Sequence, residues 1–313
     1  MSSIRVDSPG LLTTVQDLGR QGYGAIGVSP SGAADPVSLR LGNRLVGNPE
    51  GAAALEMTLI GGAFSFPDSA VVALTGSDFG SMLDEVPVSP WRSFEVRPGQ
   101  LLRLGPTRSG ARCYLCIQGG IAVPPLLGSA STHLLSGLGG FEGRALRKGD
   151  VLQIGALRKA FRAYTVAPRV IQLLSQRNVL RVTRGPQADW FGESSLRAFF
   201  AATFRVGEQS NRMGIRLEGA QIAQPKTASM ITEGVSLGAI QVPPGGSPII
   251  LFVEQQTTGG YPKIANVISA DLHRLGQLRP RDEIRFELFT LETARALLIE
   301  QEKMLVSPET ILE

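Results

Sequence analysis

The sequence has few aromatic residues, little net charge and no long hydrophobic run. Phe, Trp and Tyr make up 6% of its 313 residues, and the net charge is only +4. With basic residues scattered along the chain, this composition does not indicate a nucleic-acid-binding surface. No apolar run reaches the length of a membrane span, and the N-terminal MSSIRVDSPG lacks the apolar core of a signal peptide. We therefore expect a cytoplasmic protein that binds neither membranes nor nucleic acids.

Cysteine and histidine are also scarce, which leaves little material for a metal site. Cys113 and Cys116 have C-x-x-C spacing, but they fall in an expected strand, where residues three apart point to opposite faces. The sequence has no second cysteine pair to complete a zinc site. His133 and His273 are far apart. We expect two reduced thiols in the core and no bound metal.

What the sequence does contain is typical of a β-rich protein. Its 37 glycines and 20 prolines favour many turns. Short apolar runs alternate with turn residues over residues 53–154, which is the spacing of an antiparallel barrel or sandwich. The chain is also long for a single core. We expect a first domain over residues 1–155, a second over residues 179–290, and a C-terminal helix and tail over residues 291–313.

A few short helices are expected within this framework. Asp35 followed by Pro36 predicts a helix start, with Asp as the N-cap and Pro in the first turn. A second helix is expected over residues 194–202. A third is expected over residues 263–275, where Ile264, Val267, Ile268, Leu272 and Leu275 share one helical face.

The two halves of the chain repeat a pattern. In each half, an apolar strand is followed by a glycine-containing loop and then by an L-R-x-x-D-x-[LI] turn. This turn occupies residues 146–152 in the first half and residues 278–284 in the second. An internal repeat predicts two related domains.

Residues 254–263, EQQTTGGYPK, form the first candidate site. They follow the apolar run 248–253, which predicts a buried strand. Glycines allow backbone N–H groups to approach a ligand closely, and the expected helix start adds unpaired N–H groups and a positive dipole end. The alternative is a hydrophilic connection with a tight turn. The candidate ligand-binding residues are Gln255, Gln256, Thr257, Thr258, Gly259, Gly260 and Tyr261, with Lys263 as the candidate catalytic cation.

Other polar clusters lie at expected strand ends. Asp17 and Arg20 follow one short strand, and Ser31 precedes Asp35. Asn211 and Arg212 fall in an expected hairpin, where a turn is the simplest interpretation, but an arginine beside an asparagine is also suited to clamp a carboxylate. The sequence has no P-loop, no G-x-S-x-G elbow and no biotinylation motif.

Five segments carry a resemblance to a known family. They are TVQDLGRQGYGAIGVSPSGAAD (14–35), ALEMTLIGG (54–62), RGPQADWF (184–191), SNRMGIRLEG (210–219) and EGVSLGAIQVPPGGSPIILFVEQQTTGGYPKIANVI (233–268). In this order they resemble the allophanate hydrolase subunit 2 family, also called the biotin-dependent carboxyltransferase-like family. The resemblance covers nearly the whole chain. It implies a mainly β fold of two cyclophilin-like β-barrel domains with a few short helices.

As a free-standing chain, the sequence most resembles the C-subunit branch of ATP-dependent 5-oxoprolinases. This resemblance implies a complex with the 5-oxoprolinase A and B subunits, of which B is itself cyclophilin-like, that opens 5-oxo-L-proline to L-glutamate. ATP would be used by the complex, at a site that the sequence does not locate, and no biotin would be attached to this chain. Two alternatives remain open. One is hydrolysis or carboxyl transfer on urea or allophanate, and the other is a non-catalytic regulatory partner that binds a kinase-inhibitor-like protein of the B-subunit type.

Opening a lactam requires donors for the developing oxyanion and a clamp for the ring carboxylate. On the resemblance, backbone N–H groups near Gly259 and the side chain of Lys263 would stabilise anionic oxygen, and Arg212 with Asn211 would hold a carboxylate. The acid/base would be Asp17, Asp35 or Asp271, and the sequence does not choose among them.

Overall fold

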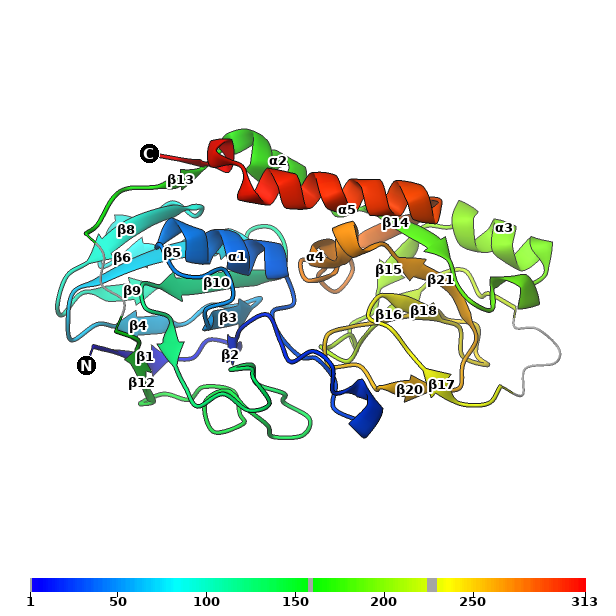
Figure 1. Ribbon diagram of the computed structural model, residues 1–313, viewed down its shortest axis with the longest axis horizontal. Coiled ribbons are helices and arrows are strands. Elements are labelled where there is room, and N and C mark those ends of the chain that lie inside the picture. The colour runs from blue at the N-terminus through cyan, green and yellow to red at the C-terminus, as the bar shows by residue number, and fades with distance from the viewer. Residues whose placement is uncertain (1, 157–159, 224–229) are drawn as a thin grey trace. The chain divides into compact units, whose positions relative to one another are not determined.

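Strands make up most of the regular structure in this computed structural model, which describes residues 2–156, 160–223 and 230–313 (Figure 1). The predicted mainly β architecture with a few short helices is confirmed. The chain divides into two units, and each is described here by itself. The first unit contains residues 1–20, 31–173 and 305–313, and the second contains residues 21–30 and 174–304.

In the first unit the strands form two seven-stranded sheets, with the orders β11-β12-β1-β4-β9-β6-β7 and β2-β3-β10-β5-β8-β13-β23. Both sheets contribute to one apolar core, which includes Ile4 and Leu102 from one sheet and Leu74 and Leu115 from the other. The strands are β1 (Ser3–Ser8), β2 (Leu12–Gln16), β3 (Ala54–Thr58), β4 (Ala63–Ser65), β5 (Ala70–Gly76), β6 (Met82–Leu83), β7 (Val86–Pro87), β8 (Arg92–Val96), β9 (Leu101–Arg103), β10 (Arg112–Ile117), β11 (Ile121–Ala122), β12 (Val151–Ile154), β13 (Thr165–Val166) and β23 (Ile311–Leu312).

Helix α1 (Pro36–Leu45) packs against β5 and β10 of this unit (Figure 1). Its predicted start is confirmed, because the Asp35 side chain accepts a hydrogen bond from the Ser38 N–H. The helix approaches β10 at Gly42, where an added Cβ would lie 2.6 Å from the Cys116 sulfur. Cys116 therefore faces the helix, whereas Cys113 belongs to the core between the sheets. The two thiols are free and buried, as predicted, and burial raises the pKa of each.

The second unit is built on a closed barrel with the order β14-β21-β18-β19-β16-β15-β22. The barrel strands are β14 (Val179–Arg184), β15 (Phe204–Val206), β16 (Gly214–Glu218), β18 (Ala239–Gln241), β19 (Ile249–Leu251), β21 (Lys263–Val267) and β22 (Glu283–Leu288). A separate two-stranded sheet joins β17 (Glu233–Gly234) to β20 (Thr258–Gly259). The remaining α-helices are α2 (Pro168–Ser175), α3 (Glu193–Ala201), α4 (Leu272–Leu275) and α5 (Leu291–Val306).

The repeated L-R-x-x-D turn has the same backbone geometry in both units. In the first unit the Arg147 N–H donates to the Asp150 side chain at 2.7 Å, and the Asp150 carbonyl accepts from the Val6 N–H. In the second unit the Arg279 N–H donates to the Asp282 side chain at 2.9 Å, and the Asp282 carbonyl accepts from the Val206 N–H. The residue before each aspartate has a positive φ, 91° at Gly149 and 74° at Arg281. This agreement supports the internal repeat.

The helix expected over residues 263–275 is wrong for most of its length. Residues 263–267 form β21, and helical structure begins only with a 3-10 turn at Ser269–Asp271 and α4. β21 pairs with β14 on one side and β18 on the other. Its side chains are buried on both faces except at the half-buried Asn266. Apolar and polar residues therefore do not alternate along the strand, and the resulting spacing resembles that of a helix.

Candidate functional site

Lys263 is the buried charge around which the candidate site is arranged. It is the first residue of β21, and its side chain is only 3% exposed. A buried ammonium requires a partner of opposite charge. Its Nζ lies 2.5 Å from Oε1 of Glu233, whose side chain is 44% exposed. The ion pair therefore joins a buried cation to a carboxylate at the surface, on the short strand β17.

A loop after β14 holds this ion pair from a second direction. The Gln187 side chain accepts a hydrogen bond from the Lys263 N–H at 3.2 Å and donates one to Glu233 Oε1 at 3.0 Å. Gly185 permits the approach, because a Cβ there would lie 2.2 Å from the Lys263 carbonyl oxygen. One amide side chain thus fixes both members of the pair.

Two buried side-chain amides of the second unit, one of them paired with Lys263, have unused hydrogen-bonding capacity. Gln241 is the strand neighbour of Lys263 across the β18–β21 pair, and Gln255 donates to the Val235 carbonyl at 3.4 Å. Within the part of the chain that the structure describes, Nε2 of Gln241 and Oε1 of Gln255 are buried without a hydrogen-bond partner. An unsatisfied buried polar atom is costly and often marks a functional position. The free atom of Gln241 is a hydrogen-bond donor, and the free atom of Gln255 is an acceptor.

The Gly-Gly pair has unequal surroundings. A Cβ on Gly259 would lie 2.5 Å from Gln241 Nε2 and 3.0 Å from Gln256 Nε2. On Gly260 the nearest atom would be the Thr232 hydroxyl, at 3.5 Å. A larger residue at position 259 would therefore have to displace the end of the Gln241 side chain. The expectation that a helix begins just after these glycines is wrong, since the strand β21 follows them.

We call Lys263, Glu233, Gln187, Gln241 and Gln255 the lysine cluster. The close contact of the Lys263 ammonium, followed by the hydrogen bond from Gln187, lowers the pKa of Glu233 below its usual value. The carboxylate is therefore ionised at neutral pH. Sequence reasoning found Lys263 and Gln255 but missed the other three. The signal was available, because Gln187 lies in RGPQADWF and Glu233 and Gln241 lie in EGVSLGAIQV, two of the segments that carry the resemblance.

The other predicted residues of the EQQTTGGYPK stretch surround the cluster less closely. Gln256 and Thr257 are half-buried, and the Thr257 carbonyl accepts from the Val235 N–H. Thr258 is exposed, and Tyr261 is 42% exposed.

The predicted carboxylate clamp already holds a carboxylate of the protein. Arg212 is buried, and its guanidinium binds the buried carboxylate of Glu254. Asn211 is exposed, and its side-chain oxygen accepts from the Met213 N–H at 2.8 Å. These contacts brace the predicted hairpin between β15 and β16, which the structure confirms.

Asp271, a candidate acid/base, is completely buried in the second unit. Its carboxylate accepts hydrogen bonds from the Arg181 N–H at 2.8 Å and from the Arg181 guanidinium. Arg274 lies 3.3 Å away. These contacts give Asp271 a structural role in fastening the α4 region to β14.

Asp17 and Arg20 of the first unit both bind the segment 129–132. Asp17 accepts hydrogen bonds from the Ser129 hydroxyl at 2.6 Å, the Ser131 hydroxyl at 2.5 Å and the Ala130 N–H at 2.6 Å. The Arg20 guanidinium, which is 1% exposed, donates to the Ser131 carbonyl. Both charged groups thus hold the end of β2 against this loop.

Ser31 and Asp35 of the same unit also have internal partners. The Ser31 hydroxyl donates to the Thr132 carbonyl at 2.7 Å. Both carboxylate oxygens of Asp35 accept from Ser38, one from its N–H and one from its hydroxyl. The buried carboxylate of Asp35 is therefore explained by its role as the helix cap, and no ligand is needed to explain it.

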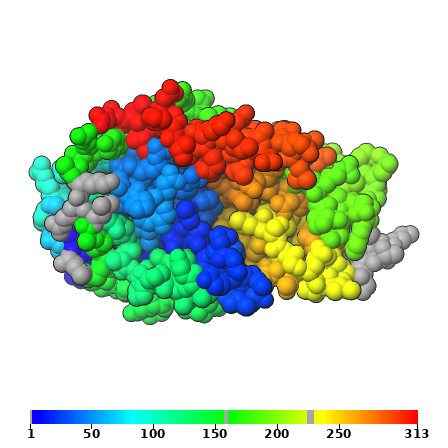
Figure 2. Space-filling model, in the orientation of Figure 1, coloured from blue at the N-terminus to red at the C-terminus, as the bar shows by residue number. Residues whose placement is uncertain are grey.

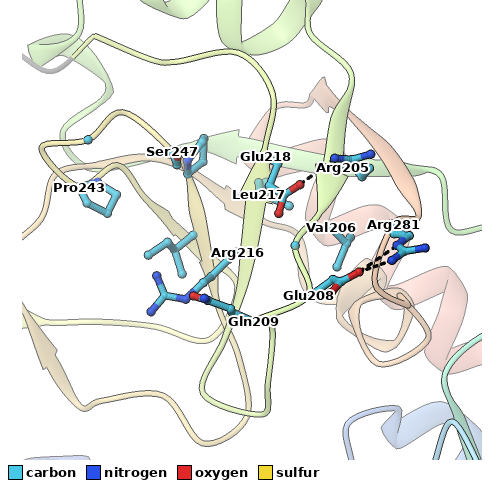
Figure 3. A pocket seen from close by; sticks show the side chains of 14 residues that line it. Arg205, Val206, Glu208, Gln209, Arg216, Leu217, Glu218, Pro243, Ser247 and Arg281 are labelled. Carbon is cyan, nitrogen blue, oxygen red and sulfur yellow. Dashed lines mark hydrogen bonds and ion pairs between the residues drawn. The ribbon is translucent and has the colours of Figure 1, made fainter.

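A separate groove of about 850 Å³ lies over β15 and β16 in the second unit (Figure 3). Arg205 pairs with Glu218 at 3.1 Å, and Arg281 with Glu208 at 2.5 Å. All four of these side chains are more than half exposed, so the two ion pairs contribute little to the stability of the fold. The groove lacks the buried, unsatisfied polar groups of the lysine cluster, and we place the candidate site at the cluster.

A metal-binding group of three or more His, Cys, Asp or Glu side chains is not found among the described residues. Over the same residues, no helix has the length and apolar character needed to span a membrane.

Comparison with known proteins gives a consistent result. Residues 26–288 match the family described as "Carboxyltransferase domain, subdomain A and B". The chain is 41% identical to the C subunit of 5-oxoprolinase from Escherichia coli over 292 residues, which cover 93% of each protein. It is 38% identical to the corresponding C subunit from Haemophilus influenzae, over 91% of this chain and 90% of the relative.

Among solved structures, the urea amidolyase of K. lactis superposes with a TM-score of 0.90 at 33% identity. That match covers 99% of this chain but only 21% of the larger protein. The resemblance read from the five segments is thereby confirmed. The chain belongs to the carboxyltransferase domain, subdomain A and B, family.

Proposed function

We propose that this chain is the C component of an ATP-dependent 5-oxoprolinase, and that its lysine cluster binds the cyclic amide. Relatives at 38–41% identity over about nine-tenths of the chain are C subunits of 5-oxoprolinase, which supports the assignment. ATP and the A and B subunits enter this proposal at the level of the complex. The observation that carries the proposal is the buried lysine with the unsatisfied amide donor of Gln241 as its strand neighbour.

The hydrogen-bonding groups of the cluster match those of a lactam. A lactam is held cis by its ring, so its carbonyl oxygen and its N–H lie on one edge. The free donor of Gln241 suits the carbonyl oxygen, and the free acceptor of Gln255 suits the N–H. Fixed donors of this kind also stabilise negative charge that develops on the carbonyl oxygen when water attacks.

Lys263 is the cation that the cluster offers to the ring carboxylate of 5-oxoproline. Arg212, the sequence-based candidate for this role, is occupied by Glu254. A buried ammonium holds an anionic oxygen more strongly than an exposed one, because solvent screens it less.

The test is Lys263→Met in the complex reconstituted with the A and B subunits, with ATP-dependent formation of L-glutamate as the readout. Lys263→Met keeps most of the side-chain volume, and we expect at least a hundredfold loss of kcat/KM, about 3 kcal/mol of transition-state stabilisation. The matched control is Lys303→Met, which removes an exposed lysine of α5 in the same unit, and should have full activity. Unchanged glutamate formation in Lys263→Met would remove Lys263 from the reaction.

The urea amidolyase match supports one alternative substrate class. Urea and allophanate also present a carbonyl oxygen beside an N–H, so the same pair of amides would serve. A comparison of 5-oxoproline, urea and allophanate as substrates of the reconstituted complex separates these functions. Tight binding of a B-subunit protein without turnover of any of the three would instead favour the non-catalytic role.

A further inference from the structure

The Lys263–Glu233 pair differs from the Arg212–Glu254 pair of the same unit in one respect. In the Arg212–Glu254 pair both side chains are buried, with exposures of 5% and 2%. In the Lys263–Glu233 pair the lysine is 3% exposed and the glutamate 44%. The Nζ atom of Lys263 is itself inaccessible to solvent. Glu233 is therefore the surface-facing partner of an enclosed cation.

The element that bears Glu233 is not part of the barrel. Strand β17 has two residues and, among the residues that the structure describes, pairs only with β20, with Glu233 opposite Gly259 and Gly234 opposite Thr258. The preceding residues Ile231 and Thr232 are exposed, and the yellow segment that includes β17 reaches the surface in Figure 2. Lys263, by contrast, belongs to a barrel strand paired on both sides. Glu233 can therefore move without breaking the pairing that positions the lysine.

We propose that Glu233 is a displaceable internal ligand, whose carboxylate fills the place of a substrate carboxylate on Lys263 and leaves when the substrate binds. This inference rests on the proposed function, because it assigns the same lysine to the substrate. Exchange of one carboxylate for another keeps the ammonium paired in both states, so the buried charge is never left alone. The site thus favours small amides that carry a carboxylate over neutral amides of the same shape.

The test measures the rate at which acetic anhydride acetylates Lys263 in the full chain, by peptide mass spectrometry. In the wild type we expect slow reaction, because the side-chain nitrogen is enclosed and paired with Glu233. In Glu233→Ala we expect reaction about tenfold faster, because the amine loses its ion-pair partner and becomes accessible to the reagent. Glu218→Ala, which removes a carboxylate from an exposed ion pair of the same unit, is the matched control and should leave Lys263 slow. Glu233→Gln, which has nearly the same shape as the native residue, repeats the test if the alanine variant fails to fold.

A second measurement asks which ligands protect Lys263 in Glu233→Ala. We expect 5-oxo-L-proline and acetate to slow the acetylation, and 2-pyrrolidone, the same ring without the carboxylate, to have little effect. In the wild type, protection by 5-oxo-L-proline should require about tenfold more ligand, because Glu233 competes. Equal Lys263 reactivity in wild type and both Glu233 variants, or equal protection by 5-oxo-L-proline and 2-pyrrolidone, would overturn the exchange.

The turnover assay separates this inference from the proposed function. If acetylation and protection behave as expected but the reconstituted complex forms no glutamate, the carboxylate exchange stands and the 5-oxoprolinase assignment fails. The complex could instead form glutamate in a Lys263-dependent way while Glu233 substitutions leave the acetylation rate of Lys263 unchanged. In that case the 5-oxoprolinase assignment stands and only the carboxylate exchange fails.

Discussion

Arg212 and Glu254 hold each other twice, once through their side chains and once through their backbones. The guanidinium of Arg212 binds the carboxylate of Glu254, and the Glu254 N–H donates to the Arg212 carbonyl at 2.8 Å. Arg212 lies in the connection between β15 and β16, and Glu254 begins the stretch that leads to Lys263. The pair therefore fixes the start of the candidate site to the barrel wall.

Arg212→Met is expected to destabilise the protein strongly, because it leaves the Glu254 carboxylate buried without its partner. Removing one member of a buried ion pair typically costs about 3–5 kcal/mol in the free energy of unfolding. Urea denaturation followed by circular dichroism measures this loss. Arg205→Met is the control in the neighbouring strand, since its ion pair with Glu218 is exposed, and its removal should cost less than about 1 kcal/mol. Similar losses in the two variants would show that the Arg212 pair is not structural.

The two glycines of the EQQTTGGYPK stretch should respond differently to alanine. A Cβ on Gly259 collides with the Gln241 amide at 2.5 Å, whereas on Gly260 it finds its nearest atom at 3.5 Å. We expect Gly259→Ala to displace Gln241 and cost about 1–3 kcal/mol, together with most of the glutamate-forming activity of the complex. Gly260→Ala should be within about 0.5 kcal/mol of the wild type. Denaturation and turnover measured in parallel test this prediction, and equal tolerance of the two substitutions would contradict the tight packing of Gln241 against Gly259.

Much of the fold could be predicted from local signals. Asp35 with Pro36 marked the start of α1, the C-x-x-C pair was correctly placed on a strand, and the L-R-x-x-D turns revealed a repeat that the backbone hydrogen bonds now support. Each of these signals is carried by residues within a short segment of the sequence. The β21 strand was mistaken for a helix because strands buried on both faces lose the alternation that identifies them.

The candidate site was only partly predictable, because most of its partners are distant in sequence. Lys263 was singled out as a lone cation in a polar stretch, but its counter-ion lies 30 residues earlier and Gln187 lies 76 residues earlier. Strand pairing brings Gln241 opposite Lys263, and only the register shows this. Conversely, Asp17, Asp35 and Asp271 carry the residue type of an acid/base, but internal hydrogen bonds occupy them. These bonds are tertiary for Asp17 and Asp271 and form a local helix cap for Asp35.

Substitution of Asp35 distinguishes a helix cap from a catalytic carboxylate. Asp35→Ala should cost about 1 kcal/mol in the free energy of unfolding, because the first turn of α1 loses its cap. Asp35→Ser should recover most of this loss, since serine is also a good N-cap. If the role is structural, Asp35→Ser also retains turnover in the reconstituted complex. A stable Asp35→Ser protein without activity would instead make Asp35 a catalytic carboxylate.

Asp150 should make the first unit sensitive to acid. Hydrogen bonds from the Arg144 guanidinium, which lies 2.7 Å away, and from the Arg147 N–H lower the pKa of this carboxyl. A folded-state pKa below the unfolded value of about 3.9 means that the stabilisation is fully present above that pH and is lost as the pH falls through the folded pKa. Asp150→Asn should therefore destabilise the protein at about pH 7, and the difference from the wild type should shrink below about pH 4. Urea denaturation at both pH values measures it, with Asp68→Asn, an exposed carboxylate of the same unit, as the control. A difference between wild type and Asp150→Asn that is the same at both pH values would show that the Asp150 charge does not contribute to the stability of this turn.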